Sequence, residues 1–313
     1  MMAATLRIAT RASALALWQS RHVAARLEAL EPGLSVELVP IRTEGDRILD
    51  RPLAAIGGKG LFIKELEVAM AEGRADLAVH SMKDVPAELP PGFALAAILE
   101  REDPRDVLVS TGGGGLDALP PGACVGTSSL RRRSQLLARR PDLDIRDLRG
   151  NVPTRLQRLR DGHFAAIVLA AAGLRRLELF DDDCRCLAVE EMLPAVGQGA
   201  IGIECRADDH ALRARLARLD HAATAARVSA ERAMNACLGG SCQVPIAGHA
   251  RIDGETLSLA GLVAGVDGVE VVRQTASGAV GDAAAVGRAV GEAMLAAGAA
   301  RILAALDPDR PDS

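Results

Sequence analysis

The sequence of 313 residues is poor in aromatic side chains and has neither a long apolar run nor a paired cysteine motif. It contains four Phe, one Trp and no Tyr, so it offers little surface for stacking on nucleic-acid bases. No uninterrupted apolar stretch is long enough for a membrane-spanning helix, and no long apolar run follows a basic head at the amino terminus. We therefore expect a cytoplasmic protein with no signal peptide.

The cysteines are too scattered to predict a metal site. They stand at positions 124, 184, 186, 205, 237 and 242, with no C-x-x-C pair, and no His or Cys lies at zinc-finger spacing from Cys184 and Cys186. In a reducing compartment, each is by default a small buried thiol.

Lysine is also scarce, with 3 residues against 34 arginines. An ammonium is a compact point charge that the guanidinium fork does not replace. Lys59 and Lys83 are therefore candidate site residues, whereas Lys64, next to Glu65 on a predicted helix, is expected at the surface.

The overall composition is that of a globular protein. Apolar residues make up 49% of the chain and charged residues 25%, and the net charge is −4. The net charge argues against a general nucleic-acid or membrane-surface binder. A chain of this length is expected to divide into two or three domains.

The stretch Ala75–Pro86 has the strongest local signal for a site. Its first half is typical of a short buried strand, and the strand runs out into Ser81, Lys83 and Asp84 before Pro86 stops it. In open α/β sheets, ligands bind at the carboxyl ends of the strands. Taken alone, the same residues could also form a solvated surface turn.

Strands and helices are predicted to alternate along most of the chain. We expect strands near 6–10, 36–41, 94–99, 106–110, 145–148, 165–170 and 200–205, and helices near 14–30, 61–72, 208–219 and 224–238. Ser13 can cap the first helix, so Thr10, Arg11 and Ser13 suggest an anion seat. The Gly112–Gly115 turn suggests a hinge or domain junction. Strands near 246–251, 256–263 and 269–274 and a helix over 282–297 predict a small α+β unit.

Positive charge is concentrated in residues 127–160. This segment holds ten arginines and three aspartates, hence a net charge of +7, in a protein whose net charge is −4. Such one-sided charge indicates an acidic ligand, and the scarcity of aromatics favours a small polycarboxylate or phosphate over nucleic acid.

Eight motifs, in this order and spacing, make the chain similar to the porphobilinogen deaminase (hydroxymethylbilane synthase) family from end to end. They are Leu6–Arg11, Gly57–Phe62, Val79–Pro86, Gly126–Arg132, Leu148–Asn151, Leu193–Gly199, Glu231–Asn235 and Gly240–Pro245.

The resemblance implies an α/β fold with two periplasmic-binding-protein-like lobes and a small C-terminal α+β domain. The expected divisions are residues 1–99 with 200–219, residues 100–199, and residues 220–313. The family expectation for the oligomeric state is a monomer.

The resemblance also implies a reaction and a cofactor. Four porphobilinogen molecules are joined head to tail with loss of ammonia, and water releases the linear tetrapyrrole. The family carries a dipyrromethane cofactor, bound through a thioether to a cysteine that matches Cys242.

Site residues follow from the same matches, position by position. Asp84 falls on the family's catalytic aspartate, and no metal is implied. The positions that match substrate- or cofactor-binding residues are Arg11, Gln19, Asp46, Lys59, Ser81, Lys83, Thr127, Ser128, Ser129, Arg131, Arg132, Arg149, Asn151, Arg155, Arg176 and Gln198. Arg133, beside one of these motifs, is expected to be solvated.

Two other functions remain as alternatives. The two-lobed fold could serve a non-catalytic anion-binding protein, since fold alone does not determine function. The arginine-rich segment could instead bind nucleic acid, which a steep salt dependence of binding would reveal.

Overall fold

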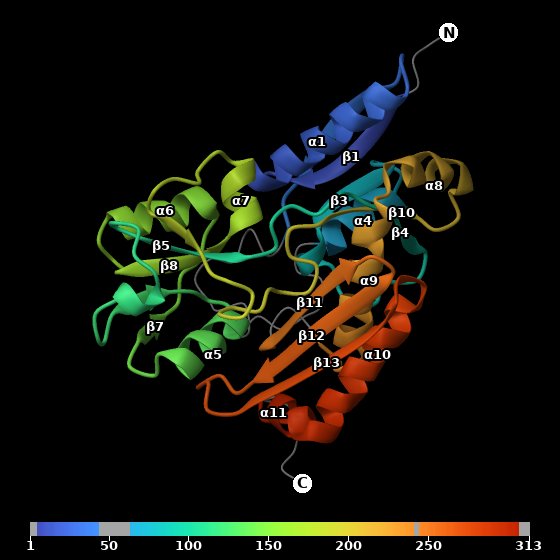
Figure 1. Cartoon of the computed structure of the whole chain (residues 1–313). Coiled ribbons are helices and arrows are strands. Elements are labelled where there is room, and N and C mark those ends of the chain that lie inside the picture. Colours follow the sequence, from blue (N-terminus) through green and yellow to red (C-terminus); the bar gives the residue numbers. More distant parts are fainter. Residues whose placement is uncertain (1–4, 44–62, 241–243, 307–313) are drawn as a thin grey trace.

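Three sheets organise the computed structural model, which describes residues 5–43, 63–240 and 244–306. Two five-stranded sheets form two α/β lobes, and a three-stranded sheet with its helices forms a smaller C-terminal domain (Figure 1). The predicted fold class is confirmed. None of the described helices is long and apolar enough to cross a membrane.

Lobe one is built on a mixed sheet with the strand order β2-β1-β3-β10-β4. Its strands are β1 (Thr5–Arg11), β2 (Ser35–Ile41), β3 (Leu77–Ser81), β4 (Phe93–Ile98) and β10 (Ile201–Arg206). Its helices are α1 (Ala14–Leu30), α4 (Lys64–Ala71) and α8 (His210–Leu216). β10 runs antiparallel between β3 and β4, so a strand from late in the chain completes this sheet.

Helices α1 and α4 pack on opposite faces of the lobe-one sheet. Val23 and Leu27 of α1 join one apolar cluster with Leu77 of β3, whereas Leu66 of α4 packs with Ala78 of the same strand. Ser13 caps α1 as predicted, because its Oγ accepts the Ala16 N–H at 3.3 Å. The alternation of side chains along β3 therefore sends Ser81 toward α1 and His80 toward α4.

Lobe two repeats this arrangement with the strand order β7-β6-β8-β5-β9. Its strands are β5 (Asp106–Ser110), β6 (Cys124–Gly126), β7 (Asp144–Arg146), β8 (Ala166–Ala170) and β9 (Cys184–Cys186). Its helices are α5 (Leu130–Arg139), α6 (Val152–Arg160) and α7 (Ala171–Arg176). The short edge strand β9 has no counterpart among the predicted strands.

The Gly112–Gly115 turn is not a domain junction. It lies between β5 and β6, which belong to the same sheet, so it is part of lobe two. The chain passes from lobe one to lobe two between β4 and β5, and it returns between β9 and β10. A glycine-rich turn reports local backbone freedom, and the pairing of its flanking strands decides whether it joins domains.

The C-terminal domain packs helices on one face of an antiparallel sheet (Figure 1). Its elements are α9 (Ala222–Cys237), β11 (Ile246–Asp253), β12 (Thr256–Ala264), β13 (Val271–Ala279), α10 (Ala283–Met294) and α11 (Ala300–Ala304). β13 continues past its predicted end because the small residues after Gln274 still pair with β12 along this edge. The predicted α+β unit is thus present.

A buried cluster of ionisable groups lies between α4 and the lobe-one sheet. His80 Nε2 lies 2.7 Å from Glu204 Oε2, and both side chains are buried. The two residues stand diagonally on the neighbouring strands β3 and β10, since Glu204 is paired with Ala78. Glu67 of α4 approaches Glu204 from the helix side and is also buried.

Burial raises the pKa of Glu67 to about 7, and repulsion and a side-chain hydrogen bond from Glu204 add to the increase, which His80 opposes. Beyond these groups, Arg232 of α9 interacts electrostatically with Glu204. Glu67 therefore keeps its proton in the folded chain between about pH 4.5 and pH 7, where the same carboxyl group of the unfolded chain has lost it.

This protonation predicts a pH-dependent stability that Glu67→Gln removes. The stabilisation is fully present below the ordinary carboxyl pKa of 4.5 and is lost as the pH rises through about 7. Between pH 5 and pH 8, the free energy of unfolding of the original protein should fall by on the order of 2 kcal/mol more than that of Glu67→Gln. Urea unfolding at the two pH values measures this, with the exposed Glu72→Gln as the control. An equal loss in all three proteins would contradict it.

Candidate active site

The carboxyl end of β3 presents Ser81, Lys83 and Asp84 at the edge of lobe one, as the sequence predicts. Met82–Asp84 forms one turn of 3-10 helix directly after the strand. Gln19 of α1 donates its Nε2–H to Ser81 Oγ at 2.8 Å, so these two predicted residues are in contact. Arg11 ends β1, which lies parallel to β3, and so stands at the same edge of the sheet.

The anion seat suggested by Thr10, Arg11 and Ser13 is not formed as an open site. Thr10 is fully buried, and its Oγ1 accepts a hydrogen bond from Ser20 Oγ at 2.7 Å. Ser13 Oγ is already used as the cap of α1. Of the three residues, Arg11 alone remains a candidate site residue.

In lobe two, the hydroxyl and amide residues shape the loops that begin two helices. Ser129 caps α5, and Asn151 caps α6 by accepting the Thr154 N–H at 2.9 Å. Thr127 Oγ1 accepts the Ser129 N–H at 3.2 Å, and Ser128 Oγ accepts the Leu148 N–H at 3.0 Å. The first turns of these helices carry Arg131, Arg132 and Arg155, so the caps determine where the basic side chains begin.

One buried carboxylate, Asp106 at the start of β5, holds three of the predicted site residues together. Its Oδ2 accepts from Arg131 Nη1 at 2.7 Å, and its Oδ1 accepts from Arg132 Nη2 at 2.8 Å and from Gln198 Nε2 at 3.0 Å. Burial alone would raise the pKa of Asp106, but the two guanidinium charges outweigh it and hold the pKa well below its usual range.

Arg131 and Arg132 also donate to main-chain carbonyls. Arg131 Nη1 reaches Leu193 O at 2.8 Å, and Arg132 Nη1 reaches Val168 O at 2.7 Å. Each guanidinium has five N–H donors, so both retain donors for a ligand. Their positions are nevertheless set by protein contacts.

Lys83 joins this network from lobe one. Its Nζ donates to Gln198 Oε1 at 3.5 Å, and Gln198 in turn contacts Asp106. Burial lowers the pKa of Lys83 to about 8, and Arg132 and Arg131 lower it further, against Asp84 and Asp106. The ammonium of one lobe thus lies within the charge cluster of the other.

Arg149 and Arg155 add positive charge that the protein does not fully neutralise. Arg155 Nε donates to Gly150 O at 2.8 Å, and burial lowers the pKa of Arg155 to about 10, with help from Arg132 and Arg149 and against Asp84. Arg149 Nη1 is buried and has no hydrogen-bond partner among the described residues. A buried donor of this kind marks a place where an anion would be stabilised.

Arg176 lies at the contact between the two lobes. Its Nη2 donates to Gly199 O at 2.7 Å, and its guanidinium lies over the Trp18 ring of α1, 5.5 Å from the centroid. Burial lowers its pKa to about 10. This arginine of α7 contacts α1 of lobe one and the turn before β10. In the structure it therefore holds the two lobes together.

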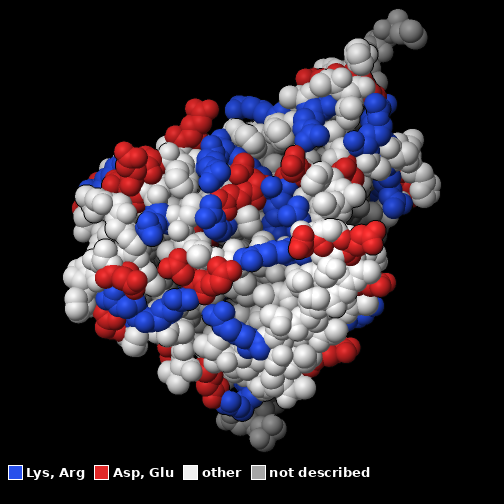
Figure 2. Space-filling model, in the orientation of Figure 1, with Lys and Arg blue, Asp and Glu red and all other residues white. Residues whose placement is uncertain are grey.

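Asp106 offsets part of the +7 charge of residues 127–160 in the folded protein, because it lies outside this segment and pairs with Arg131 and Arg132. Arg140 and Arg146 pair with Asp142 and Asp144, each at 2.7 Å, but both aspartates are already counted in the +7. Figure 2 shows both signs of charge mixed over the lobes on the face in view, without the broad basic surface of a nucleic-acid binder. Arg133 is not fully solvated as expected, because its Nε atom is buried.

Three predicted site residues, Asp46, Lys59 and Cys242, lie outside the described residues. Sequence reasoning missed Asp106 and the Arg101–Glu231 pair, which is buried with Nη1 to Oε1 at 2.6 Å. An acidic residue at the start of an apolar strand was the available sequence signal for Asp106. Arg101 and Glu231 are 130 positions apart, so no local sequence pattern indicates that they pair.

The donors present fit a ligand with several carboxylates. The charge of Arg132 acts on both Lys83 and Arg155, and that of Arg149 acts on Arg155. The buried Arg149 Nη1 has no hydrogen-bond partner among the described residues. Guanidinium groups bind carboxylates bidentately. Among the described residues, no group of three or more His, Cys, Asp or Glu side chains is placed to hold a metal ion.

Two family models match nearly the whole chain. The model "Porphobilinogen deaminase, dipyromethane cofactor binding domain" matches residues 6–214, and "Porphobilinogen deaminase, C-terminal domain" matches residues 225–296. The first alone covers more than half of the chain.

Solved structures of other proteins are similar at low identity. The BvgS VFT2 domain of Bordetella pertussis is 16% identical with a TM-score of 0.42, over 69% of this chain and 86% of that one. YtmK of Bacillus subtilis, described as a probable amino-acid ABC transporter extracellular-binding protein, is 10% identical with a TM-score of 0.41, over 69% and 89%. The BenM effector-binding domain is 14% identical with a TM-score of 0.44, over 70% and 91%.

The network predicts that Lys83 titrates near pH 8. The chain has three lysines, so reductive ¹³C-methylation yields few resonances, and Lys83→Arg assigns the one of interest. Its midpoint should lie at about 8 instead of the ordinary 10.5. Asp106→Asn should lower it further, because the Asp106 charge favours the ammonium, whereas the surface variant Asp144→Asn should not. A midpoint near 10.5 would show that the lysine is solvated.

Proposed function

The chain belongs to the porphobilinogen deaminase family, and from this premise we propose that Asp84 and the basic side chains around it carry out the family's reaction. The enzyme is a hydroxymethylbilane synthase, a transferase that condenses four porphobilinogen molecules head to tail with loss of ammonia. Its cofactor is dipyrromethane. The alternative of a two-lobed binding protein without catalysis is not favoured.

Asp84 is the proposed catalytic residue. Loss of ammonia from porphobilinogen leaves a cation, which a fixed carboxylate stabilises most strongly where water is excluded. Asp84 can also accept the pyrrole N–H of the substrate. The observation that carries this proposal is the position of Asp84 at the end of β3, where its charge acts on both Lys83 and Arg155.

The basic residues are proposed to bind the carboxylates of substrate and cofactor. Each pyrrole ring bears an acetate and a propionate, so a growing chain brings more carboxylates at every step. The buried Arg149 Nη1 has no hydrogen-bond partner among the described residues. Arg149 and Arg132 act electrostatically on Arg155, and Arg132 acts on Lys83. When bound, dipyrromethane supplies the pyrrole to which the first substrate molecule is joined.

The remaining predicted positions have supporting roles in this proposal. Gln19 and Ser81 orient each other beside Asp84, Gln198 connects Lys83 to Asp106, and Arg11 faces the same edge. The loop caps Thr127, Ser128, Ser129 and Asn151 orient the helices. Arg131 holds Asp106 and Leu193 O together within lobe two, and Arg176 connects the two lobes. Asp46 and Lys59 are carried over on their motif positions alone.

Cys242 is proposed to anchor the cofactor, on the strength of its motif. α9 ends at Cys237 and leads toward this position, and β11 begins at Ile246 beyond it. We further propose that the protein acts in the cytoplasm as a monomer, with no nucleic-acid or membrane partner. The proposed domains are residues 1–99 with 200–219, 100–199 and 220–313, and the sheet membership of β10 supports the first division.

Replacement of Asp84 tests the catalytic proposal. Asp84→Asn keeps the shape of the side chain but removes its charge, so porphobilinogen consumption should fall by at least about 100-fold. The nearby exposed Glu88→Gln is the matched control and should consume substrate at the original rate. Near-normal turnover by Asp84→Asn would remove the carboxylate from the mechanism.

The intact mass of the purified protein tests the anchor. We expect a mass excess equal to a dipyrromethane that is absent from Cys242→Ser but retained in Cys237→Ser. A protein without the excess would be incubated with porphobilinogen and measured again. A persistent bare mass, or an excess on Cys242→Ser, would contradict the assignment.

A further inference from the structure

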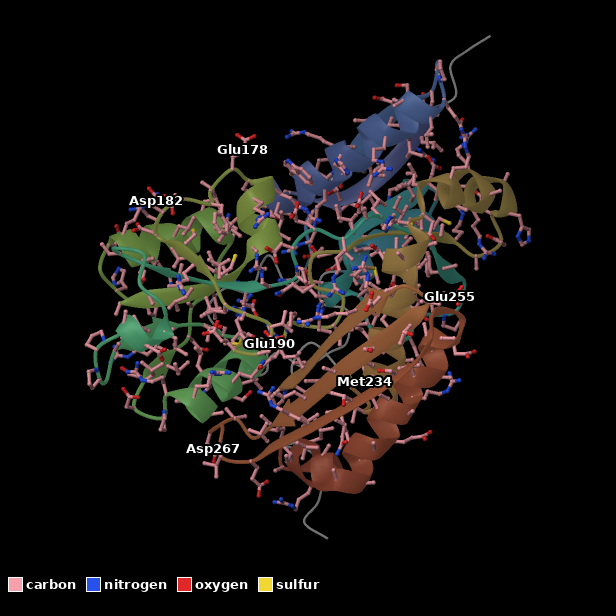
Figure 3. The ribbon with its side chains drawn as sticks, viewed as in Figure 1. Glu178, Asp182, Glu190, Met234, Glu255 and Asp267 are labelled. Atoms are coloured by element: carbon pink, nitrogen blue, oxygen red, sulfur yellow. The ribbon has the colours of Figure 1, made fainter. Side chains whose placement is uncertain are left out.

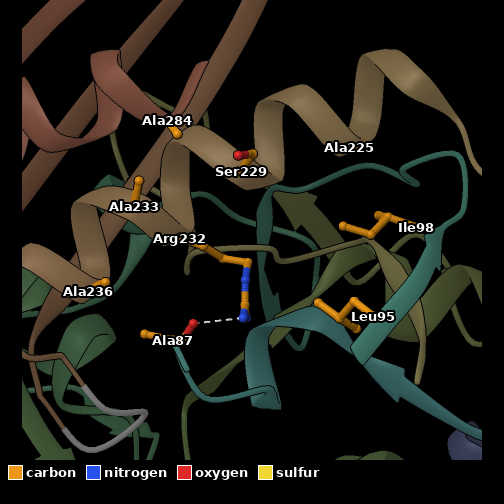
Figure 4. A pocket seen from close by; sticks show the side chains of 9 residues that line it. All are labelled: Ala87, Leu95, Ile98, Ala225, Ser229, Arg232, Ala233, Ala236 and Ala284. Atoms are coloured by element: carbon orange, nitrogen blue, oxygen red, sulfur yellow. Dashed lines mark hydrogen bonds between the residues drawn. The ribbon is translucent and has the colours of Figure 1, made fainter. Parts of the chain in front are cut away.

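Arg232 of α9 crosses from the C-terminal domain to the chain that follows Asp84. Its Nη2 donates to Ala87 O at 2.8 Å (Figure 4), and its Nη1 donates to Val85 O at 3.4 Å. These carbonyls lie on either side of Pro86, which has no N–H to contribute to a local hydrogen bond. Within the segment, Val85 N–H donates to Met82 O at 3.2 Å.

The helix that carries Arg232 is firmly held in its own domain. Met234 of α9, labelled in Figure 3, is fully buried against Gly248 and Gly261 of the sheet, where a Cβ on either glycine would collide with its side chain. Glu231, next to Arg232, pairs with Arg101 between the lobes and accepts the Gly197 N–H at 2.7 Å and the Ala250 N–H at 2.8 Å. Arg232 therefore extends from a fixed point.

Apolar packing as well as a polar contact connects α9 to the segment beyond Asp84. Val85 of this segment lies in one apolar cluster with Val228 of α9. Beside this contact is a cavity of about 350 Å³, with Leu95 and Ile98 of β4 on one side and Ala225, Ala233 and Ala236 of α9 on the other (Figure 4). Arg232 is the charged residue among those that line it. Across this space, the guanidinium provides the polar connection between the two domains.

The surroundings of the guanidinium favour a role in holding carbonyls. Burial lowers the pKa of Arg232, and the Glu204 carboxylate of β10 opposes that decrease. The planar fork spans two carbonyls that a lysine ammonium would not reach together.

We propose that Arg232 is a positioning residue for the condensation reaction, fixing the chain after Asp84 relative to the C-terminal domain. The inference rests on the catalytic role proposed for Asp84. A displacement of about 1 Å at a reacting group can cost about 100-fold in rate.

Truncation with chemical rescue tests this role on the cofactor-loaded protein, with loading checked by mass. Arg232→Ala should lower kcat about 100-fold and change KM much less. The truncation enlarges the cavity, so guanidinium ion, well below unfolding concentrations, should restore kcat at least about tenfold. Tetramethylammonium at equal ionic strength should not restore kcat, because it has no N–H donors. The kcat of Arg232→Lys should lie between that of the original protein and that of Arg232→Ala.

Arg227→Ala is the matched control, because Arg227 donates to Ala223 O and Thr224 Oγ1 of its own helix. Hydrogen exchange gives a readout besides activity: amides of residues 81–89 should exchange faster in Arg232→Ala, and guanidinium should slow them again. Unchanged kcat, or reduced kcat with unchanged exchange, would overturn the positioning role. Full activity in Asp84→Asn would instead overturn the catalytic proposal on which it rests.

Discussion

The arrangement of the site depends on a single buried carboxylate among several cations. Two guanidinium groups and an ammonium close together in a water-poor region repel one another and lose hydration, so they need a fixed negative charge. Asp106 supplies it, and its hydrogen bonds to Arg131, Arg132 and Gln198 also fix the orientation of these groups. Positive charge beyond this carboxylate, at Arg149 and Arg155, is then available to a ligand. One internal ion network thus separates residues that build the site from residues that face its occupant.

The C-terminal domain has a mechanical part in this arrangement as well as a place for the proposed anchor. Through neighbouring positions on α9, Glu231 reaches the crossover at Arg101 and the turn at Gly197, and Arg232 reaches the chain after Asp84. Contacts from both lobes therefore converge on one helix. Truncating one partner of a buried pair such as Arg101–Glu231 usually costs several kcal/mol, because the other charge is left uncompensated.

Much of the architecture could be predicted from the sequence, because apolar periodicity and capping residues act locally. The capped helix after β1 and the polar residues at the end of β3 are examples. Contacts between distant parts of the chain could not be read in this way. Asp106 looks like an acid at the start of an apolar strand, and its role appears only when α5 and the turn holding Gln198 close around it. The prediction of Thr10 as an anion ligand failed because Ser20, ten positions along the chain, is its hydrogen-bond partner in the fold.

The position of β10 has a consequence for how the protein is made. This strand lies between β3 and β4, and β4 has its pairing contacts with β10 in the described sheet. A ribosome must therefore synthesise all of lobe two before the strand that completes lobe one emerges. Domains of many proteins fold as they leave the ribosome, beginning at the amino terminus. Here the second lobe is able to close first, while β3, which leads to Asp84, waits beside an incomplete sheet edge until residue 206 is available.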